Sequence, residues 1–174
     1  MPNRHTLLQW DGGTAVPPSP AWQRFLSRVN LTPAAGISLA VDPGETCGVA
    51  VLSDGNPIRV GQVRPQEQFQ LLVDLFYDVS PQRLIIESYR VYQSRALQHI
   101  HSDVPTLRYI GAFQTLAALA HIPLYFQSAS AAKSFVDDRK LADWGLYQSG
   151  QPHLNDALRH GLHWYLFAKE ARTA

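Results

Sequence analysis

Residues 37–63 read ISLAVDPGETCGVAVLSDGNPIRVGQV, and this stretch decides the fold class. Two apolar runs, residues 37–42 and 47–53, have the length of buried strands, and a Pro-Gly turn separates them. The dipeptide Asp54-Gly55 is a strong hairpin signal, and residues 57–63 continue as a third strand. Three strands joined by tight turns predict that the sheet begins antiparallel.

Beyond these strands, helical and strand patterns alternate along the chain. The predicted helices cover residues 65–79, 106–121, 128–138 and 153–170, and the predicted strands cover residues 83–87 and 122–126. A hairpin start followed by alternating strands and helices predicts an α/β protein. Its mixed β-sheet has three antiparallel strands and then parallel strands, and α-helices flank it.

The first 35 residues differ from the rest and predict an N-terminal extension. Turn and linker signals such as Pro17-Pro18-Ser19-Pro20 dominate it, and residues 21–29 predict one short helix. We expect this partly flexible arm to dock on the core or on a partner subunit. Residues 36–174 then form a single domain, since the length and a hydrophobic content of 45% suffice for one core.

Composition excludes several classes of protein. The single cysteine, Cys47, excludes an internal disulfide and a cysteine-rich zinc site. No segment approaches about 18 consecutive apolar residues, and the N-terminus lacks a signal-peptide pattern. We therefore expect a cytoplasmic protein with no membrane partner. A net charge of +1 neither requires nor excludes a polyanionic partner.

Three acidic residues stand where buried elements begin or end. Asp42 ends the first strand, Glu87 ends the fourth strand, and Asp156 lies near the start of the last helix. Taken singly, an Asp after a strand often starts a turn, and a Glu at a strand end is usually solvated. If the first and fourth strands are neighbours, however, their carboxylates meet and repel unless a cation neutralises them. One or two Mg²⁺ ions bridging a scissile phosphate fit such a group of hard oxygen ligands.

The last helix carries a stripe of polar residues. His153, Asp156, His160 and His163 have the spacing i, i+3, i+7, i+10, which places them along one side of a helix. His153 and Asp156 could reach one metal ion together. His160 could orient a ligand or contact phosphate, although a surface position for His160 and His163 is the alternative.

Four motifs together resemble the RuvC-type Holliday junction resolvases. Residues 42–50, DPGETCGVA, are similar to the first motif of that family, and residues 84–87, LIIE, to the second. Residues 130–133, SAAK, resemble the segment that carries the lysine near the active site. Residues 153–160, HLNDALRH, resemble the final motif, in the version of small resolvase-like nucleases of bacteriophages. The resemblance covers about residues 36–169, in the family's order.

The resemblance implies an RNase H-like fold, a homodimer, and Mg²⁺, with Mn²⁺ able to substitute. It implies structure-selective cutting of branched DNA, most of all four-way junctions, in DNA recombination and repair within a bacterial or phage-infected cell. The products would carry 5′-phosphate and 3′-hydroxyl ends. The residues carried over are the metal ligands Asp42, Glu87, His153 and Asp156, and the catalytic phosphate contact Lys133.

The polar stretch after Glu87 departs from the family but suits DNA. Tyr89 and Tyr92 interleave with Arg90 and Arg95. Aromatic rings stack on unpaired bases at about 1–3 kcal/mol per base, and arginines hold phosphates. A solvated polar loop is the alternative. The predicted DNA-binding track continues through Arg108, Lys133, Arg139 and Lys140.

Three other functions compete with a junction-cutting nuclease. An ATP-binding sugar kinase or actin-like protein shares an Asp-x-Gly-x-Thr signature, but it needs two such domains, and 174 residues supply one. A non-catalytic RNase H-like module would bind nucleic acid without cutting it. An RNA–DNA hybrid nuclease or a flap nuclease would use the same site. The sequence leaves the last two open.

Overall fold

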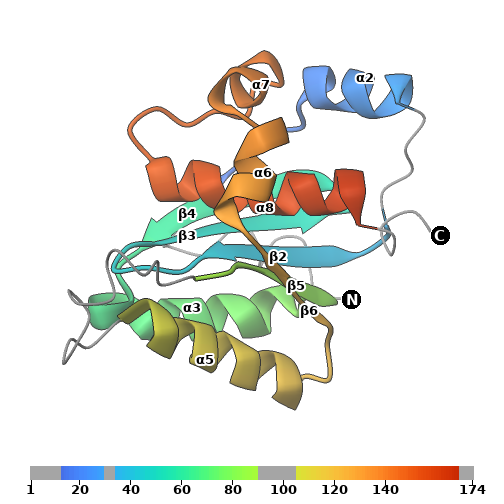
Figure 1. The fold of residues 1–174 in the computed structure, drawn as a ribbon. Coiled ribbons are helices and arrows are strands. Elements are labelled where there is room, and N and C mark those ends of the chain that lie inside the picture. Colours follow the sequence, from blue (N-terminus) through green and yellow to red (C-terminus); the bar gives the residue numbers. More distant parts are fainter. Residues whose placement is uncertain (1–12, 30–33, 90–104, 169–174) are drawn as a thin grey trace.

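The computed structural model describes residues 13–29, 34–89 and 105–168. Within these ranges a six-stranded sheet has the order β1-β4-β3-β2-β5-β6, and helices cover both of its faces (Figure 1). The strands are β1 (Gly13–Ala15), β2 (Ile37–Asp42), β3 (Cys47–Ser53), β4 (Asn56–Val63), β5 (Arg83–Glu87) and β6 (Leu124–Gln127). The helices are α2 (Pro20–Arg28), α3 (Pro65–Val79), α5 (Pro105–Leu119), α6 (Ala129–Phe135), α7 (Asp138–Asp143) and α8 (Pro152–Phe167).

The sheet changes from antiparallel to parallel at β2. Strand β2 pairs antiparallel with β3, and β3 pairs antiparallel with β4. Asp54 and Gly55 have φ of 49° and 77° at the β3–β4 turn, the left-handed backbone that a tight hairpin requires. On its other side β2 pairs parallel with β5, and β5 pairs parallel with β6. The predicted mixed sheet is confirmed.

Alternation along the strands assigns side chains to the two faces of the sheet. Leu39 and Val41 pack in the core that α3 and α5 cover, while Ala40 packs in the core that α8 covers. In Figure 1, α3 and α5 lie on one side of the sheet and α8 with α6 on the other. Asp42 follows Ala40 by two residues and Glu87 follows Ile85 by two, so both carboxylates belong to the α8 face.

Two glycines let α8 lie unusually close to the sheet. A Cβ atom added to Gly161 of α8 would lie 2.6 Å from Leu52 Cδ1 and 3.2 Å from Ala40 Cβ. A Cβ atom added to Gly48 of β3 would lie 1.8 Å from the backbone oxygen of His153. The first turn of α8 is therefore in direct contact with the strand next to β2, which brings His153 and the residues after it to the end of β2.

The described part of the N-terminal arm, residues 13–29, packs on the core. Strand β1 extends the sheet along β4, where Arg59 Nη2 donates to Gly13 O at 2.9 Å. In α2 the indole of Trp22 is fully buried, donates to Gly55 O at 3.0 Å, and packs on Trp144 with ring centroids 4.8 Å apart. Ser19 caps α2 and donates its hydroxyl to Trp144 O. Helix α2 thus docks on the core, as expected, and the boundary after residue 35 stays a prediction.

Two elements differ from the sequence-based expectation. Strand β1 lies where the sequence predicts linker, because three residues at a sheet edge give too short a strand pattern. The single helix predicted over residues 128–138 is wrong: α6 ends at Phe135, and Asp137 then caps α7, its Oδ1 accepting from Lys140 N at 2.8 Å. Asp137 is a strong helix-starting residue and ends the first helical run. In the described parts of the chain, no helix is long and apolar enough to cross a membrane.

Candidate metal centre

Three carboxylates from three separate elements meet at one end of the sheet. Asp42 ends β2, Glu87 ends the adjacent β5, and Asp156 lies in the second turn of α8. One oxygen from each of the three side chains lies within 4.8 Å of the others. The pairing of Val41 with Ile86 explains the approach of the first two, because each carboxylate directly follows one of these paired residues. The predicted convergence of these residues is present.

The ionisation of Asp42 reflects this crowding. Burial, together with the neighbouring charges of Glu87 and Asp156, raises the pKa of Asp42 from its ordinary value of 3.8 to about 6. The hydrogen bond and charge of His153 act in the opposite direction. A buried carboxylate that resists ionisation beside two others is the electrostatic condition that a bound divalent cation relieves.

His153 lies beside Asp42 at the first turn of α8. Its Nδ1 is 2.9 Å from Asp42 Oδ2. Among the described residues, the ligand atoms that lie within 4.8 Å of one another belong to the three carboxylates, and His153 joins this group only through its contact with Asp42. In the cation-free protein the same nitrogen can donate a hydrogen bond to the carboxylate. The role of His153 as a ligand stays a prediction.

His160 holds Glu87 from one turn further along α8. The imidazole is buried, with Nε2 at 2.8 Å from Glu87 Oε2 and Nδ1 at 3.2 Å from Gln127 Oε1. A carboxylate only accepts hydrogen bonds, so Nε2 is the donor to Glu87. Gln127 reaches His160 because it pairs with Glu87 in the β5–β6 register. His160 was expected from the helical spacing, whereas Gln127 was not, because its one signal in the sequence is its position at a strand end.

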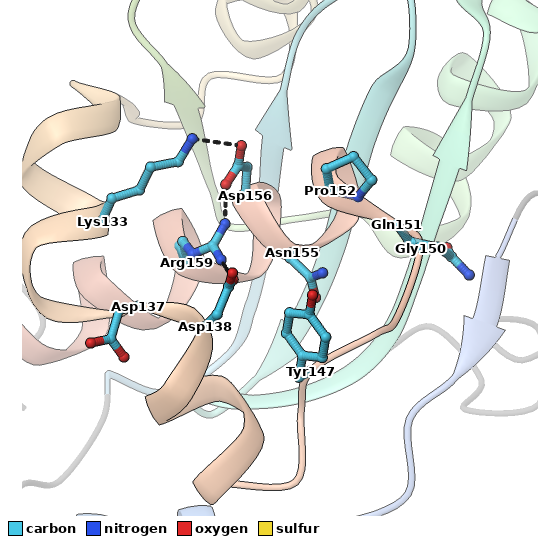
Figure 2. Close-up of a pocket in the computed structure, with 10 residues that line it drawn as sticks. All are labelled: Lys133, Asp137, Asp138, Tyr147, Gly150, Gln151, Pro152, Asn155, Asp156 and Arg159. Carbon is cyan, nitrogen blue, oxygen red and sulfur yellow. Dashed lines mark hydrogen bonds and ion pairs between the residues drawn. The ribbon is translucent and has the colours of Figure 1, made fainter.

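Two cationic side chains contact Asp156, one on each carboxylate oxygen (Figure 2). Lys133 of α6 places Nζ 2.9 Å from Asp156 Oδ2, and the lysine side chain is 50% exposed. Arg159 of α8 donates from Nη1 to Asp156 Oδ1 and from Nη2 to Asp138 Oδ1. The predicted proximity of Lys133 to the site is present. Arg159 and Asp138 were not singled out, although Arg159 follows Asp156 at helical spacing.

A cavity of about 450 Å³ opens beside these contacts. It lies where α6, α7 and the start of α8 come together, and Figure 2 shows the residues that line it. Those residues are Lys133, Asp137, Asp138, Tyr147, Gly150, Gln151, Pro152, Asn155, Asp156 and Arg159. Because Asp156 and Lys133 line it, the cavity adjoins the carboxylate group.

Three further residues predicted to contact DNA lie on α5 and α7. Arg139 is almost fully exposed on α7, 3.9 Å from Asp143. The ammonium of Lys140 lies 4.0 Å from the centre of the Phe135 ring. Arg108 is exposed on α5, on the face of the sheet opposite α8 (Figure 1).

Tyr89 is the one residue of the interleaved tyrosine–arginine stretch that the structure describes. It is half-buried and follows Glu87 by two positions. Arg90, Tyr92 and Arg95 lie outside the described residues. The DNA-binding role of all these side chains stays a prediction.

The strand order and the position of the acidic group define an RNase H-like fold. Two solved structures of RuvC from Thermus thermophilus share it. The structure in complex with a Holliday junction substrate has a TM-score of 0.59 at 19% sequence identity, over 79% of this chain and 98% of that chain. A second RuvC structure gives a TM-score of 0.53 at 18% identity, over 78% and 97% of the two chains. No family model matches the sequence, and no curated protein matches it.

Proposed function

We propose that this chain is a Mg²⁺-dependent endonuclease that cuts branched DNA, four-way junctions above all. The convergence of Asp42, Glu87 and Asp156 within 4.8 Å carries this proposal. The group lies on the RNase H-like fold shared with a protein solved in complex with a Holliday junction. In this reading residues 36–174 form the nuclease domain and residues 1–35 its extension.

The donor set fits a hard divalent cation. Three carboxylates supply the oxygen ligands that Mg²⁺ prefers, and Mn²⁺ accepts the same ligands together with an imidazole. Asp42, Glu87 and Asp156 would hold one or two ions, with His153 completing the set beside Asp42. Bound there, the metal would supply an activated water and stabilise charge on the leaving oxygen of a phosphodiester.

The protein's own side chains prepare this site. His160 restrains Glu87 by a hydrogen bond of 2.8 Å. Lys133 is half exposed and 2.9 Å from Asp156, so its ammonium can leave the carboxylate for a phosphate oxygen of a substrate. Oriented ligands and a positive charge near the scissile phosphate are what phosphodiester hydrolysis requires of the protein.

We further propose that the chain acts as a homodimer. A four-way junction presents two equivalent strands, and a two-fold symmetric dimer presents two equivalent sites to them. Tyr89, with Arg90, Tyr92 and Arg95, would contact the branch point. Arg108, Arg139 and Lys140 would contact the phosphate backbone. Light scattering of the purified protein, alone and with junction DNA, tests the dimer.

A panel of substrates tests the activity. Four-way junction, three-way junction, flap, duplex DNA and RNA–DNA hybrid are incubated with Mg²⁺ or Mn²⁺, beside an Asp42→Asn control. We expect preferential cutting of the four-way junction, leaving 5′-phosphate and 3′-hydroxyl ends, and no cutting by the control. Preferred cutting of hybrid or flap would replace the proposed substrate. Binding without cutting under either metal would instead identify a non-catalytic nucleic-acid-binding module.

A further inference from the structure

Arg159 carries a buried guanidinium group that has no role in the proposed DNA cleavage. Its side chain is 8% exposed, and each of its three nitrogens has a partner on a different element. Nε donates to Val136 O at 3.0 Å, between α6 and α7. Nη1 donates to Asp156 Oδ1 on α8, and Nη2 donates to Asp138 Oδ1 on α7. Three anchors fix both the position and the plane of the guanidinium.

Asp138 balances the charge of this guanidinium. A buried cation is tolerated only when paired, and Asp138 supplies one negative charge from a side chain that is 67% exposed. The Arg159–Asp138 pair is therefore neutral as a unit. It offers Asp156 a directed hydrogen bond without adding a net positive charge that would repel a metal ion nearby.

The hydrogen bond falls on one particular oxygen of Asp156. Arg159 donates to Oδ1 of Asp156, while the half-exposed Lys133 contacts Oδ2 at 2.9 Å. A fixed donor on one oxygen restrains the rotation of the carboxylate and leaves the second oxygen to an exchangeable partner. The buried His160 restrains the carboxylate of Glu87 in the same manner.

We propose that Arg159, charge-balanced by Asp138, is a positioning residue that holds Asp156 in the orientation that binds the divalent cation. This inference rests on the cation site of the proposed function and assigns to that site two residues outside the carboxylate group. A purely structural arginine that joins α8 to the α6–α7 turn would make the same contacts. It would affect stability and leave cation affinity unchanged.

Binding of Mn²⁺ alone to the full chain, measured by titration calorimetry, distinguishes the two roles. Arg159→Lys keeps the positive charge but cannot make all three hydrogen bonds of the guanidinium. Loss of a residue that hydrogen-bonds a metal ligand typically lowers the affinity for the metal by about 10–100-fold. We expect an increase of that order in the Kd for Mn²⁺. Asp138→Asn leaves the guanidinium charge unbalanced, so we expect a smaller increase in the same direction.

Arg83→Lys is the matched control. The guanidinium of Arg83 also donates hydrogen bonds to separate partners, to Ser38 Oγ at 2.9 Å and to Ala35 O at 2.7 Å. It begins β5, whereas Glu87 ends that strand, about 13 Å away at ~3.3 Å per residue. We expect Arg83→Lys to lower stability and to leave the Kd for Mn²⁺ within about twofold of the wild-type value, well below the 10–100-fold of an outer-partner loss.

The outcomes separate this inference from the proposed function. Wild-type protein that binds no Mn²⁺ would overturn both. Wild-type binding with an unchanged Kd in folded Arg159→Lys and Asp138→Asn would overturn the positioning role alone. If Arg159→Lys does not fold, the exposed position of Asp138 makes Asp138→Asn the deciding variant: an unchanged Kd there overturns the inference, and a raised Kd supports it.

Discussion

Replacing Asp42 by Asn removes a carboxylate whose ionisation the fold resists. Burial and the neighbouring Glu87 raise the pKa of Asp42 from 3.8 to about 6. At about 1.4 kcal/mol per pH unit, ionised Asp42 destabilises the cation-free protein by about 3 kcal/mol. Asn still accepts a hydrogen bond from His153, and weakening that bond costs about 1 kcal/mol. We therefore expect Asp42→Asn to raise the free energy of unfolding by about 2 kcal/mol at pH 8.

The sign of this effect depends on pH. Between pH 3.8 and about 6 the folded protein retains a proton on Asp42 that the unfolded chain has lost. The stability of the cation-free wild type therefore falls as pH rises through this window. Asp42→Asn lacks this contribution, so its advantage over the wild type should be absent below the window and complete above it.

With bound Mg²⁺, the wild type should become more stable than Asp42→Asn at pH 8. A ligand that binds only the folded state adds about 2.7 kcal/mol at one hundred times its Kd. The wild type should gain this stabilisation at pH 8, whereas Asp42→Asn, with a carboxylate ligand lost, should gain much less. The same variant should bind junction DNA and fail to cleave it.

Thermal unfolding at pH 4 and pH 8, with and without MgCl₂, measures each of these differences. For a chain of this size 1 kcal/mol corresponds to about 2–4 °C, so we expect Asp42→Asn to raise Tm by about 4–8 °C at pH 8 without Mg²⁺. A variant less stable than the wild type under that condition would show that the folded protein does not disfavour ionised Asp42. An equal gain from Mg²⁺ in both proteins would remove Asp42 from the cation site.

Three further predictions concern single residues. Lys133→Ala should lower the cleavage rate more than it lowers DNA affinity, and should tighten Mn²⁺ binding because the ammonium no longer occupies Asp156; a loss confined to DNA affinity would contradict this. Gly48→Ala should displace the first turn of α8 and weaken Mn²⁺ binding, whereas Gly111→Ala, with no atom within 4 Å of the added Cβ, should leave it unchanged; equal binding by both would show that the close approach does not matter. Tyr89→Ala should weaken binding to branched DNA preferentially, measured against plain duplex, and an equal loss on both would exclude base stacking.

The sequence predicted the sheet and two of the carboxylates because both follow from local pattern. Two apolar runs of strand length end in Asp42 and Glu87. They place these acids at strand ends independently of how the connecting loops fold. The juxtaposition needed only that β2 and β5 be neighbours in the sheet. Asp156 came from the motif on α8, where helical spacing fixes the relation of acid to histidine.

The partners of these carboxylates were less predictable. Gln127 meets His160 only through the β5–β6 register, which the sequence does not specify. Asp138 meets Arg159 only because the chain turns between α6 and α7, where the apolar pattern suggested one continuous helix. Contacts set by a loop or by the register of a third strand depend on the tertiary fold, so single-sequence periodicity carries little information about them.

The packing of Trp22 against Trp144 has a consequence for how the protein tolerates change. Trp144 lies just before the loop that leads into α8, the helix that carries His153 and Asp156. By packing on Trp144, helix α2 therefore stabilises the position of that loop. A substitution at Trp22, or a protease nick within residues 13–28, should therefore disturb the geometry of the carboxylate group while leaving its residues unchanged. If the proposed function holds, such changes should weaken cation binding although they lie outside the cation site.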